Sequence, residues 1–240
     1  MAQTQVAAFW DDRYSGSDYS RDEDSSVLAA ALDHFGAVSG KRLLEIGCGP
    51  GASSVFFGRL GANVTGLDVS PKAIADFNVR CSELGLSNVR GVCANALEMS
   101  VPEPMDFVFG SMILHHIEPF SAFAERLVQL LKPGGRAFFY ENNASSSVLI
   151  WFRQNVVGKL WVPKHGDPDE FPLMPSEIEE LRKRFKVRVV YPEMFFFELV
   201  GHYLFRGHLI APFRWLDHLF YRRGWLLKYS YRQFVLLEAT

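Results

Sequence analysis

The 240-residue sequence has only three cysteines, and no two of them stand in a C-x-x-C pair. An odd number without that spacing argues against a disulfide framework or a cysteine-based zinc site, so we expect a reducing, cytoplasmic environment. The N-terminal residues are polar and acidic and do not show the basic, then apolar pattern of a secretory signal. No apolar run is long enough to span a bilayer, since even the sequence MFFFELV is interrupted by Glu198.

The chain also lacks an excess of positive charge. Its formal net charge is −2 at pH 7, which excludes a protein that coats nucleic acid through bulk positive charge. Hydrophobic residues make up 48% of the chain and charged residues 22%, which excludes intrinsic disorder. The length fits one large α/β domain, or a domain with an appended cap. Phenylalanine is abundant, with 21 residues.

The middle of the chain alternates between short apolar runs and longer stretches with helical spacing. We expect strands at residues 41–47, 63–69, 88–96, 105–113 and 136–142, and helices at residues 27–35, 52–60, 71–84 and 119–131. Ser70 and Pro71 are a typical cap and first residue for a helix. The alternation predicts βαβ units and a parallel sheet with helices on both faces, whose ligands bind outside the carboxyl ends of the strands.

Three glycines, Gly47, Gly49 and Gly51, follow the first expected strand in the sequence LLEIGCGPG. Small residues let the backbone approach a ligand, and the start of the next helix offers free N–H groups. The spacing Gly47-x-Gly49-x-x-Ala52 also satisfies the dinucleotide fingerprint. Asp68 lies 21 residues beyond Gly47, where a ribose-binding carboxylate is expected. Spacing alone therefore leaves NAD and other adenosine ligands equally possible.

Three further features distinguish between these ligands. Glu45 places a carboxylate two residues before the first glycine, where burial is costly unless the charge meets a donor or a cation, such as a sulfonium with an amino group. Pro50 removes an N–H group that would face a pyrophosphate. No Y-x-x-x-K sequence occurs, so the acid of the common single-domain NAD(P) dehydrogenases is missing. Together they favour an adenosine-bearing sulfonium.

Five motifs follow one another over about residues 40–143: LLEIGCGPG, GLDVS with Asp68, VCANALEM, MDFVFGSMILHHI and LKPGGRAFFYEN. As a set, they resemble the motifs of the class I S-adenosylmethionine-dependent methyltransferases. The resemblance implies a Rossmann-like α/β fold with a seven-stranded, mostly parallel sheet and helices on both faces. Residues 186–193 and 231–239 suit the last two strands, the final one antiparallel. We expect a single domain, with N-terminal helices and a lid (1–40), a cofactor-binding core (41–143) and acceptor-side inserts with the last strands (144–240).

The resemblance also implies roles for individual residues. Asp68 would accept hydrogen bonds from both ribose hydroxyls, and Asn95 would accept one from the adenine amino group. The sequence FWDDRY would form a lid over the cofactor, although it could equally be a surface helix. The residues that the resemblance assigns to S-adenosylmethionine are Trp10, Arg13, Tyr14, Glu45, Gly47, Cys48, Gly49, Asp68, Val69, Asn95, Ala96, Gly110 and Ser111.

Methyl transfer from a sulfonium is an in-line displacement, so the enzyme mainly aligns the two reactants and excludes water. A base is needed only when the acceptor is a hydroxyl or a protonated amine. His115, His116 and Glu141 are the candidates, and we favour His116 and Glu141; a structural role for each of them is the alternative. We expect no metal site, because adjacent histidines rarely face one ion.

Two inserts depart from the family pattern, at residues 144–172 and 194–228, and the excess phenylalanine is concentrated in the second. Their helical spacing allows three interpretations: extra core or a homodimer face, a helical cap that forms a greasy acceptor pocket, or an interfacial surface that contacts a membrane peripherally. The expected acceptor is a small or lipid-like molecule and not nucleic acid, because the N/D-P-P-Y tetrad is absent. An NAD-linked oxidoreductase and a catalytically silent scaffold are the alternative functions.

Overall fold

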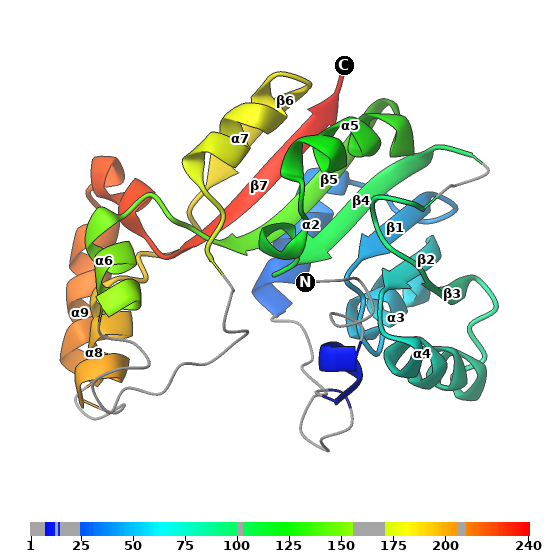
Figure 1. Cartoon of the computed structure of the whole chain (residues 1–240), viewed down its shortest axis with the longest axis horizontal. Coiled ribbons are helices and arrows are strands. Elements are labelled where there is room, and N and C mark those ends of the chain that lie inside the picture. Colours follow the sequence, from blue (N-terminus) through cyan, green and yellow to red (C-terminus); the bar gives the residue numbers. More distant parts are fainter. Residues whose placement is uncertain (1–7, 13, 15–24, 100–102, 156–170, 206–209) are drawn as a thin grey trace.

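The computed structural model describes residues 8–12, 14, 25–99, 103–155, 171–205 and 210–240. Its centre is a seven-stranded sheet with the order β3-β2-β1-β4-β5-β7-β6 (Figure 1). Only β7 runs antiparallel to its neighbours. The predicted sheet and its antiparallel last strand are therefore confirmed. The strands are β1 (Arg42–Ile46), β2 (Asn63–Asp68), β3 (Val89–Cys93), β4 (Met105–Ser111), β5 (Leu131–Asn142), β6 (Phe185–Val190) and β7 (Arg232–Ala239).

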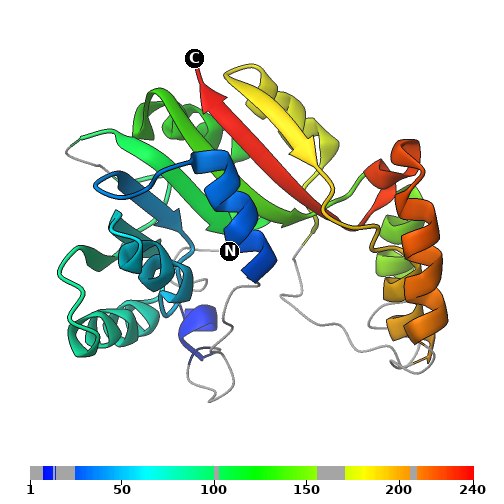
Figure 2. The same cartoon turned by 180° about the vertical axis from the view of Figure 1, so that it is seen from behind.

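Helices cover both faces of the sheet, as Figures 1 and 2 show from opposite sides. One apolar layer joins the sheet to α2 (Ser25–Phe35), α3 (Ala52–Arg59) and α4 (Pro71–Glu83). The other joins it to α5 (Phe120–Leu130) and α7 (Pro175–Arg182). Along the central strands, successive side chains enter opposite layers, because a strand alternates its side chains between two faces. The predicted covering of the sheet by helices on both faces is therefore confirmed.

Several predicted boundaries are wrong, each for a local reason. β3 stops at Cys93 instead of residue 96, because Asn95 Oδ1 accepts a hydrogen bond from the Leu97 N–H and turns the chain. β4 stops at Ser111 instead of residue 113, because Met112 adopts a left-handed backbone conformation with φ 51°. β5 starts early, at Leu131, and its pairing with β4 is irregular between Met105 and Phe107.

A group of helices follows the carboxyl end of β5 and the end of β6, and lies beside the sheet on the side away from α3 and α4 (Figures 1 and 2). The predicted C-terminal helical insert is thus present between β6 and β7. Within the described residues, no helix is both long and apolar enough to cross a bilayer. The members of this helical group are α6 (Ser147–Asn155), α8 (Phe197–Phe205), α9 (Ile210–Tyr221) and the 3-10 helix η2 (Gly224–Tyr229).

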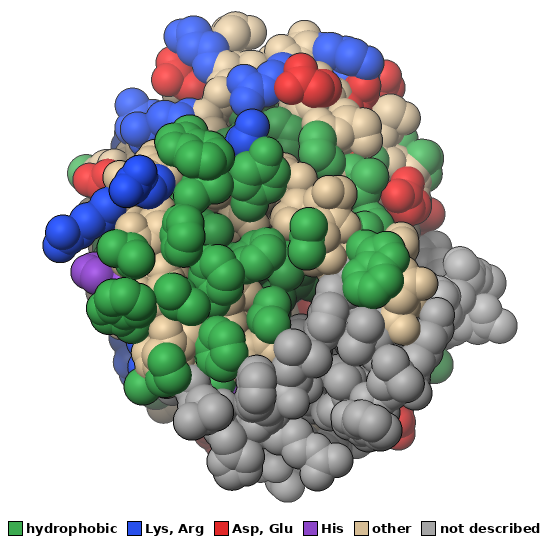
Figure 3. Space-filling model, turned by 90° about the vertical axis from the view of Figure 1, so that its left-hand side faces the viewer, with side chains coloured by type: hydrophobic (Ala, Val, Ile, Leu, Met, Phe, Trp, Pro, Cys, Tyr) green, Lys and Arg blue, Asp and Glu red, His purple; other side chains and the backbone are tan. Residues whose placement is uncertain are grey.

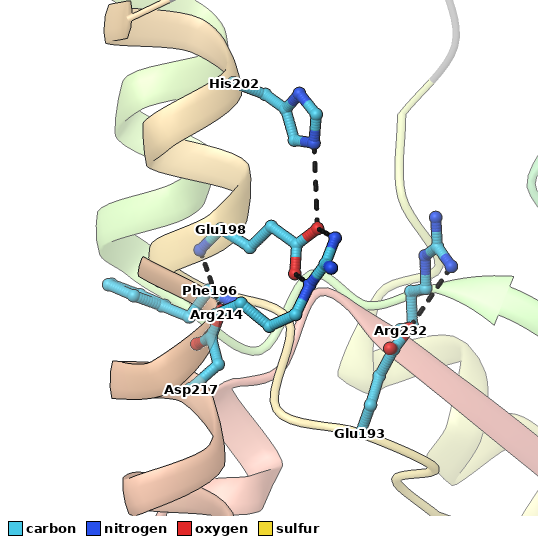
Figure 4. Close-up of polar contacts among 7 residues, drawn as sticks. All are labelled: Glu193, Phe196, Glu198, His202, Arg214, Asp217 and Arg232. Atoms are coloured by element: carbon cyan, nitrogen blue, oxygen red, sulfur yellow. Dashed lines mark hydrogen bonds and ion pairs between the residues drawn. The ribbon is translucent and has the colours of Figure 1, made fainter. Parts of the chain in front are cut away.

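A buried carboxylate joins α8 to α9. Asp217 of α9 accepts hydrogen bonds from the backbone N–H groups of Phe196, Phe197 and Glu198 at 3.1, 2.9 and 2.7 Å, at the start of α8. Figure 4 shows Asp217 beside Phe196 and Glu198. Arg214 donates two hydrogen bonds to the Glu198 carboxylate, at 3.0 and 2.7 Å. These contacts satisfy N–H groups that a helix start otherwise leaves open, so they fix the hairpin of the two helices.

Candidate active site

The glycine-rich turn after β1 is tied to both neighbouring strands. Gly47 has φ 71° and donates its N–H to the Leu67 carbonyl of β2 at 2.7 Å. A Cβ atom at this position would lie 2.7 Å from the Ile113 side chain, which follows β4. Only glycine combines this backbone conformation with such a close approach. The turn therefore lies where the carboxyl ends of β1, β2 and β4 meet.

Asp68, the last residue of β2, is buried beside this turn. Its Oδ2 accepts a hydrogen bond from the Gly49 N–H and its Oδ1 one from the Ser70 N–H, both at 2.9 Å. Burial raises the pKa of Asp68 above its ordinary value, although these hydrogen bonds act in the opposite direction. A carboxylate offers about four acceptor positions, so Asp68 can also accept from hydroxyl groups of a ligand.

A second carboxylate lies on the other side of the turn. Glu45 of β1 is buried and accepts a hydrogen bond from the hydroxyl group of Ser54 in α3. Cys48 lies between the two carboxylates. Burial, with the charges of Glu45 and Asp68, raises the pKa of the Cys48 thiol well above its usual range. The thiol is therefore neutral, so Cys48 adds no negative charge beside the turn.

The residues that the resemblance places at adenine lie at the ends of β2 and β3. Val69 follows Asp68 directly and is half-buried, and Ala96 is buried in the turn after β3. The Asn95 side-chain oxygen accepts the Leu97 N–H at 2.9 Å, so it already serves the local turn. An adenine amino group could reach this oxygen only through its second lone pair.

The end of β4 brings the chain toward the two histidines. Gly110 pairs with Ile46 of β1 on one side and with Phe139 of β5 on the other, and Ser111 pairs with Tyr140. Gly110 and Ser111 thus lie beside the end of β1, where the glycine-rich turn begins. The left-handed conformation of Met112 turns the chain directly after them, into the 3-10 helix η1 (Leu114–His116).

Glu141 of β5 is paired with His115, and both side chains are buried, with 0% and 2% exposure. Glu141 Oε2 lies 2.6 Å from His115 Nδ1, and Oε1 accepts the N–H groups of Ile113 and Leu114 at 2.8 and 2.6 Å. A carboxylate that holds two N–H groups acts as an acceptor, so Nδ1 carries the ring proton of neutral His115 and Nε2 is the basic nitrogen of the ring. Among the described residues, no group of three or more His, Cys, Asp or Glu side chains could hold a metal ion.

His116, which sequence analysis favoured over His115, does not occupy the position next to Glu141. Its ring centroid lies 4.1 Å from that of His115 and 5.5 Å from that of Trp10, in an edge-to-face contact. The choice between two adjacent histidines depends on the direction in which η1 turns. Sequence spacing carries no signal for that direction.

The N-terminal segment 8–12 is helical. Together with Tyr14, it lies near both the glycine-rich turn and His116. Trp10 contacts His116, and a Cβ atom on Gly49 would lie 2.9 Å from the Tyr14 hydroxyl oxygen. Asp11 Oδ1 accepts hydrogen bonds from the Ser70 hydroxyl group and from the Lys72 N–H, the latter at 3.2 Å. Sequence analysis missed this role of Asp11, for which the acidic FWDDRY sequence was the only signal. Arg13 lies outside the described residues.

Residues 43–135 match the family model of a methyltransferase domain. A ubiquinone biosynthesis O-methyltransferase of Cupriavidus pinatubonensis is 33% identical over 152 residues, which cover 61% of this chain and 60% of that protein. A protein of the same description from Ralstonia nicotianae is 34% identical over 144 residues, 59% of this chain and 60% of that protein. The chain thus spans less than two thirds of the length of these relatives.

Solved structures share the whole fold at low sequence identity. The N-methyltransferase NodS from Bradyrhizobium japonicum, in complex with S-adenosyl-L-homocysteine, has a TM-score of 0.64 and 17% identity over 98% of both chains. The geranyl diphosphate C-methyltransferase from Streptomyces coelicolor has a TM-score of 0.61 and 17% identity, over 99% of this chain and 97% of that one.

The methyltransferase domain model matches residues 43–135, the part of the chain whose motifs resemble the class I S-adenosylmethionine-dependent methyltransferases, and the two solved methyltransferases share the fold. The family model covers the glycine-rich turn and Asp68. The match favours S-adenosylmethionine over NAD, a choice that the glycine spacing leaves open.

Proposed function

We propose that the chain methylates a hydroxyl group of a small lipophilic molecule, with S-adenosylmethionine as the methyl donor. The observation that carries this proposal is the buried pair of His115 and Glu141, because a hydroxyl acceptor requires a base. The relatives described above are named O-methyltransferases of ubiquinone biosynthesis, so their names point to an oxygen acceptor on the way to a lipophilic quinone. A phenolic hydroxyl on a ring with an isoprenoid tail is therefore the acceptor that we favour.

The residues around the glycine-rich turn suit this cofactor, which supplies a methyl group already bonded to a good leaving group. Asp68 would accept hydrogen bonds from ribose hydroxyls at the positions that Gly49 and Ser70 leave open. Glu45 and Cys48, with the backbone of Gly47, would line the methionine part, where a nearby carboxylate favours a cation.

The residues proposed for the adenine ring, the amino group and the lid lie on either side of the glycine-rich turn. Val69, Asn95 and Ala96 would border the adenine ring, and the carbonyl groups of Gly110 and Ser111 would hold the amino group. Trp10 and Tyr14 would close the N-terminal side and exclude water, because they contact His116 and Gly49. Arg13 remains a predicted member of this lid.

In the proposed reaction, His115 Nε2 would accept the proton of the acceptor hydroxyl, whose oxygen would take the methyl group that S-adenosylmethionine supplies when bound. Glu141 holds His115 Nδ1 and stabilises the imidazolium that forms, so it acts as a positioning residue. His116, the base that sequence analysis favours, is the alternative proton acceptor. The two assignments of the base predict a loss of kcat in different single variants.

The test is isothermal titration calorimetry with S-adenosylmethionine and with NAD, followed by methyl transfer from labelled cofactor to a prenylated catechol and to unsubstituted catechol. We expect binding of S-adenosylmethionine, transfer to the prenylated acceptor, and a loss of kcat of about 100-fold or more in His115→Ala but not in His116→Ala. Loss only in His116→Ala would assign the base to His116. Cofactor binding without transfer to any hydroxyl acceptor would contradict the proposal and favour a scaffold.

A lipophilic acceptor agrees with the predicted peripheral membrane contact through residues 194–228. The cytoplasmic location, the homodimer and the division into lid, core and acceptor-side regions stay predictions.

A further inference from the structure

The helical group beside the sheet exposes large apolar side chains on its outer face. Trp151, Trp215 and Trp225 are 60%, 63% and 69% exposed, and Val148 and Leu219 lie on the same helices at 61% and 47%. Figure 3 views this side of the molecule and shows hydrophobic side chains gathered over its middle, with Lys and Arg side chains at the left and a mixture of basic and acidic side chains along the top. Single exposed apolar residues are ordinary, but several on neighbouring helices mark an interaction surface.

The inner face of α9 is already occupied, so its outer face is not needed for packing within the chain. Phe220 contacts Phe197 of α8 with ring centroids 5.3 Å apart, and Phe213 lies against Gly201 of α8. Asp217 holds the start of α8 from the same side. Most exposed residues of α9 follow helical spacing on its opposite side, and they are Ala211, Pro212, Trp215, His218 and Leu219. Arg222, directly after the helix, continues this spacing, whereas the exposed Arg214 and Tyr221 lie to the side of it.

The charges on this helical group are uneven. Its acidic side chains are used internally, because Asp217 is buried and Glu198 is bonded to Arg214. Arg222, Arg223 and Lys228 are exposed next to Trp225 in the chain, and within the described part of the protein Arg222 and Arg223 form no ion pair. The outward charge of α9 and η2 is therefore positive.

We propose that the outer face of α6, α9 and η2 docks on an anionic lipid bilayer. Indole rings are apolar with one polar N–H group, so tryptophan side chains insert at the boundary between headgroups and acyl chains. Arginines beside them meet anionic headgroups. A second copy of the chain fits less well, because α6, α9 and η2 contain no acidic residue except the buried Asp217, so the same face of a second copy would offer no acidic partner to these arginines. The proposal does not depend on the identity of the methyl acceptor.

The test uses the full chain and vesicles of phosphatidylcholine, either alone or mixed in equal parts with phosphatidylglycerol. Cosedimentation and a blue shift of tryptophan fluorescence report binding. We expect binding to the mixed vesicles, and a loss of about tenfold in apparent affinity when Trp215→Ser and Trp225→Ser are combined. Arg222→Gln and Arg223→Gln should each weaken binding about fivefold, and only to the anionic vesicles. Val79→Ser, a matched control on α4 with 57% exposure, should bind as the original chain does.

Circular dichroism and calorimetry with S-adenosylmethionine accompany each variant, so loss of folding or of cofactor binding is separated from loss of docking. Absence of vesicle binding by the original chain would overturn the proposal. So would equal losses in the tryptophan variants and in Val79→Ser. A dimer in light scattering that the tryptophan variants dissociate, with no binding to either vesicle, would assign the face to a second copy instead.

Discussion

Glu141 fixes the orientation of His115 from the neighbouring strand. One carboxylate oxygen lies 2.6 Å from His115 Nδ1, and the other holds the N–H groups of Ile113 and Leu114, which start the turn that carries the histidine. One side chain of β5 therefore determines both the path of the chain after β4 and the face that the imidazole ring presents. Any role of His115 in proton transfer should depend on this carboxylate.

Glu141→Gln tests this dependence. Glutamine keeps the shape, but it removes the charge that stabilises the imidazolium, and its amide group cannot accept at both positions. We expect kcat to fall about 100-fold with a smaller change in KM. We also expect a change in the pH at which kcat reaches its alkaline plateau. Glu118→Gln is the matched control, because Glu118 is exposed and bonds only to the nearby Phe120 N–H among the described contacts. An unaltered kcat and pH profile in Glu141→Gln would leave Glu141 with a structural role alone.

Asp68→Ala tests the assignment of the ribose site. The substitution removes the acceptor that Gly49 and Ser70 orient, so we expect the affinity for S-adenosylmethionine to fall by about 1–3 kcal/mol in calorimetry. Asp76→Ala provides the control, because Asp76 is an exposed carboxylate of α4 paired with Lys72. Equal affinities of the original chain and Asp68→Ala would show that the ribose hydroxyls bind elsewhere.

The same carboxylate predicts a pH dependence of cofactor binding. Burial raises the pKa of Asp68 above its ordinary value of 3.8 in the unliganded protein. Ribose hydroxyls donate more strongly to the ionised form, so affinity is complete above this raised pKa and falls as the pH drops through it. We expect the dissociation constant to begin to rise at a higher pH than the titration of an ordinary aspartate would give. Asp68→Asn, which does not titrate, should bind weakly with no such dependence. Parallel curves for the two proteins would contradict the prediction.

Local chemistry explains which parts of the fold could be predicted. Ser70 caps α4 through its hydroxyl group, which accepts the Ala73 N–H, and Pro71 is the first helical residue, as the sequence indicates. The alternation of apolar runs predicted the sheet, and the position of β7 followed from the family resemblance. These features depend on neighbours in the chain or on a pattern shared by the family.

The features that could not be predicted depend on residues far apart in the sequence. Asp11 bonds to Ser70, which lies 59 positions later in the sequence. Glu141 pairs with His115, 26 positions earlier, because of the direction of the turn that carries the two histidines. The outer face of α6, α9 and η2 required the packing of α9 on α8, because helical spacing alone does not tell which side of a helix is covered.

Gly51→Ala separates the structural glycine of the turn from those that face the cofactor. Gly51 has φ 80°, and a Cβ atom there would lie 2.0 Å from the Phe77 ring of α4, which is buried in the core. The substitution combines a left-handed backbone strain with overpacking, so we expect the free energy of unfolding to fall by about 2–4 kcal/mol in urea denaturation. Gly85→Ala is the control, because Gly85 has φ 66° with no atom within 4 Å of the added Cβ, and strain alone should cost about 1 kcal/mol. Equal losses in the two variants would mean that the Phe77 ring moves aside freely. In that case Gly51 would be kept for its backbone conformation only.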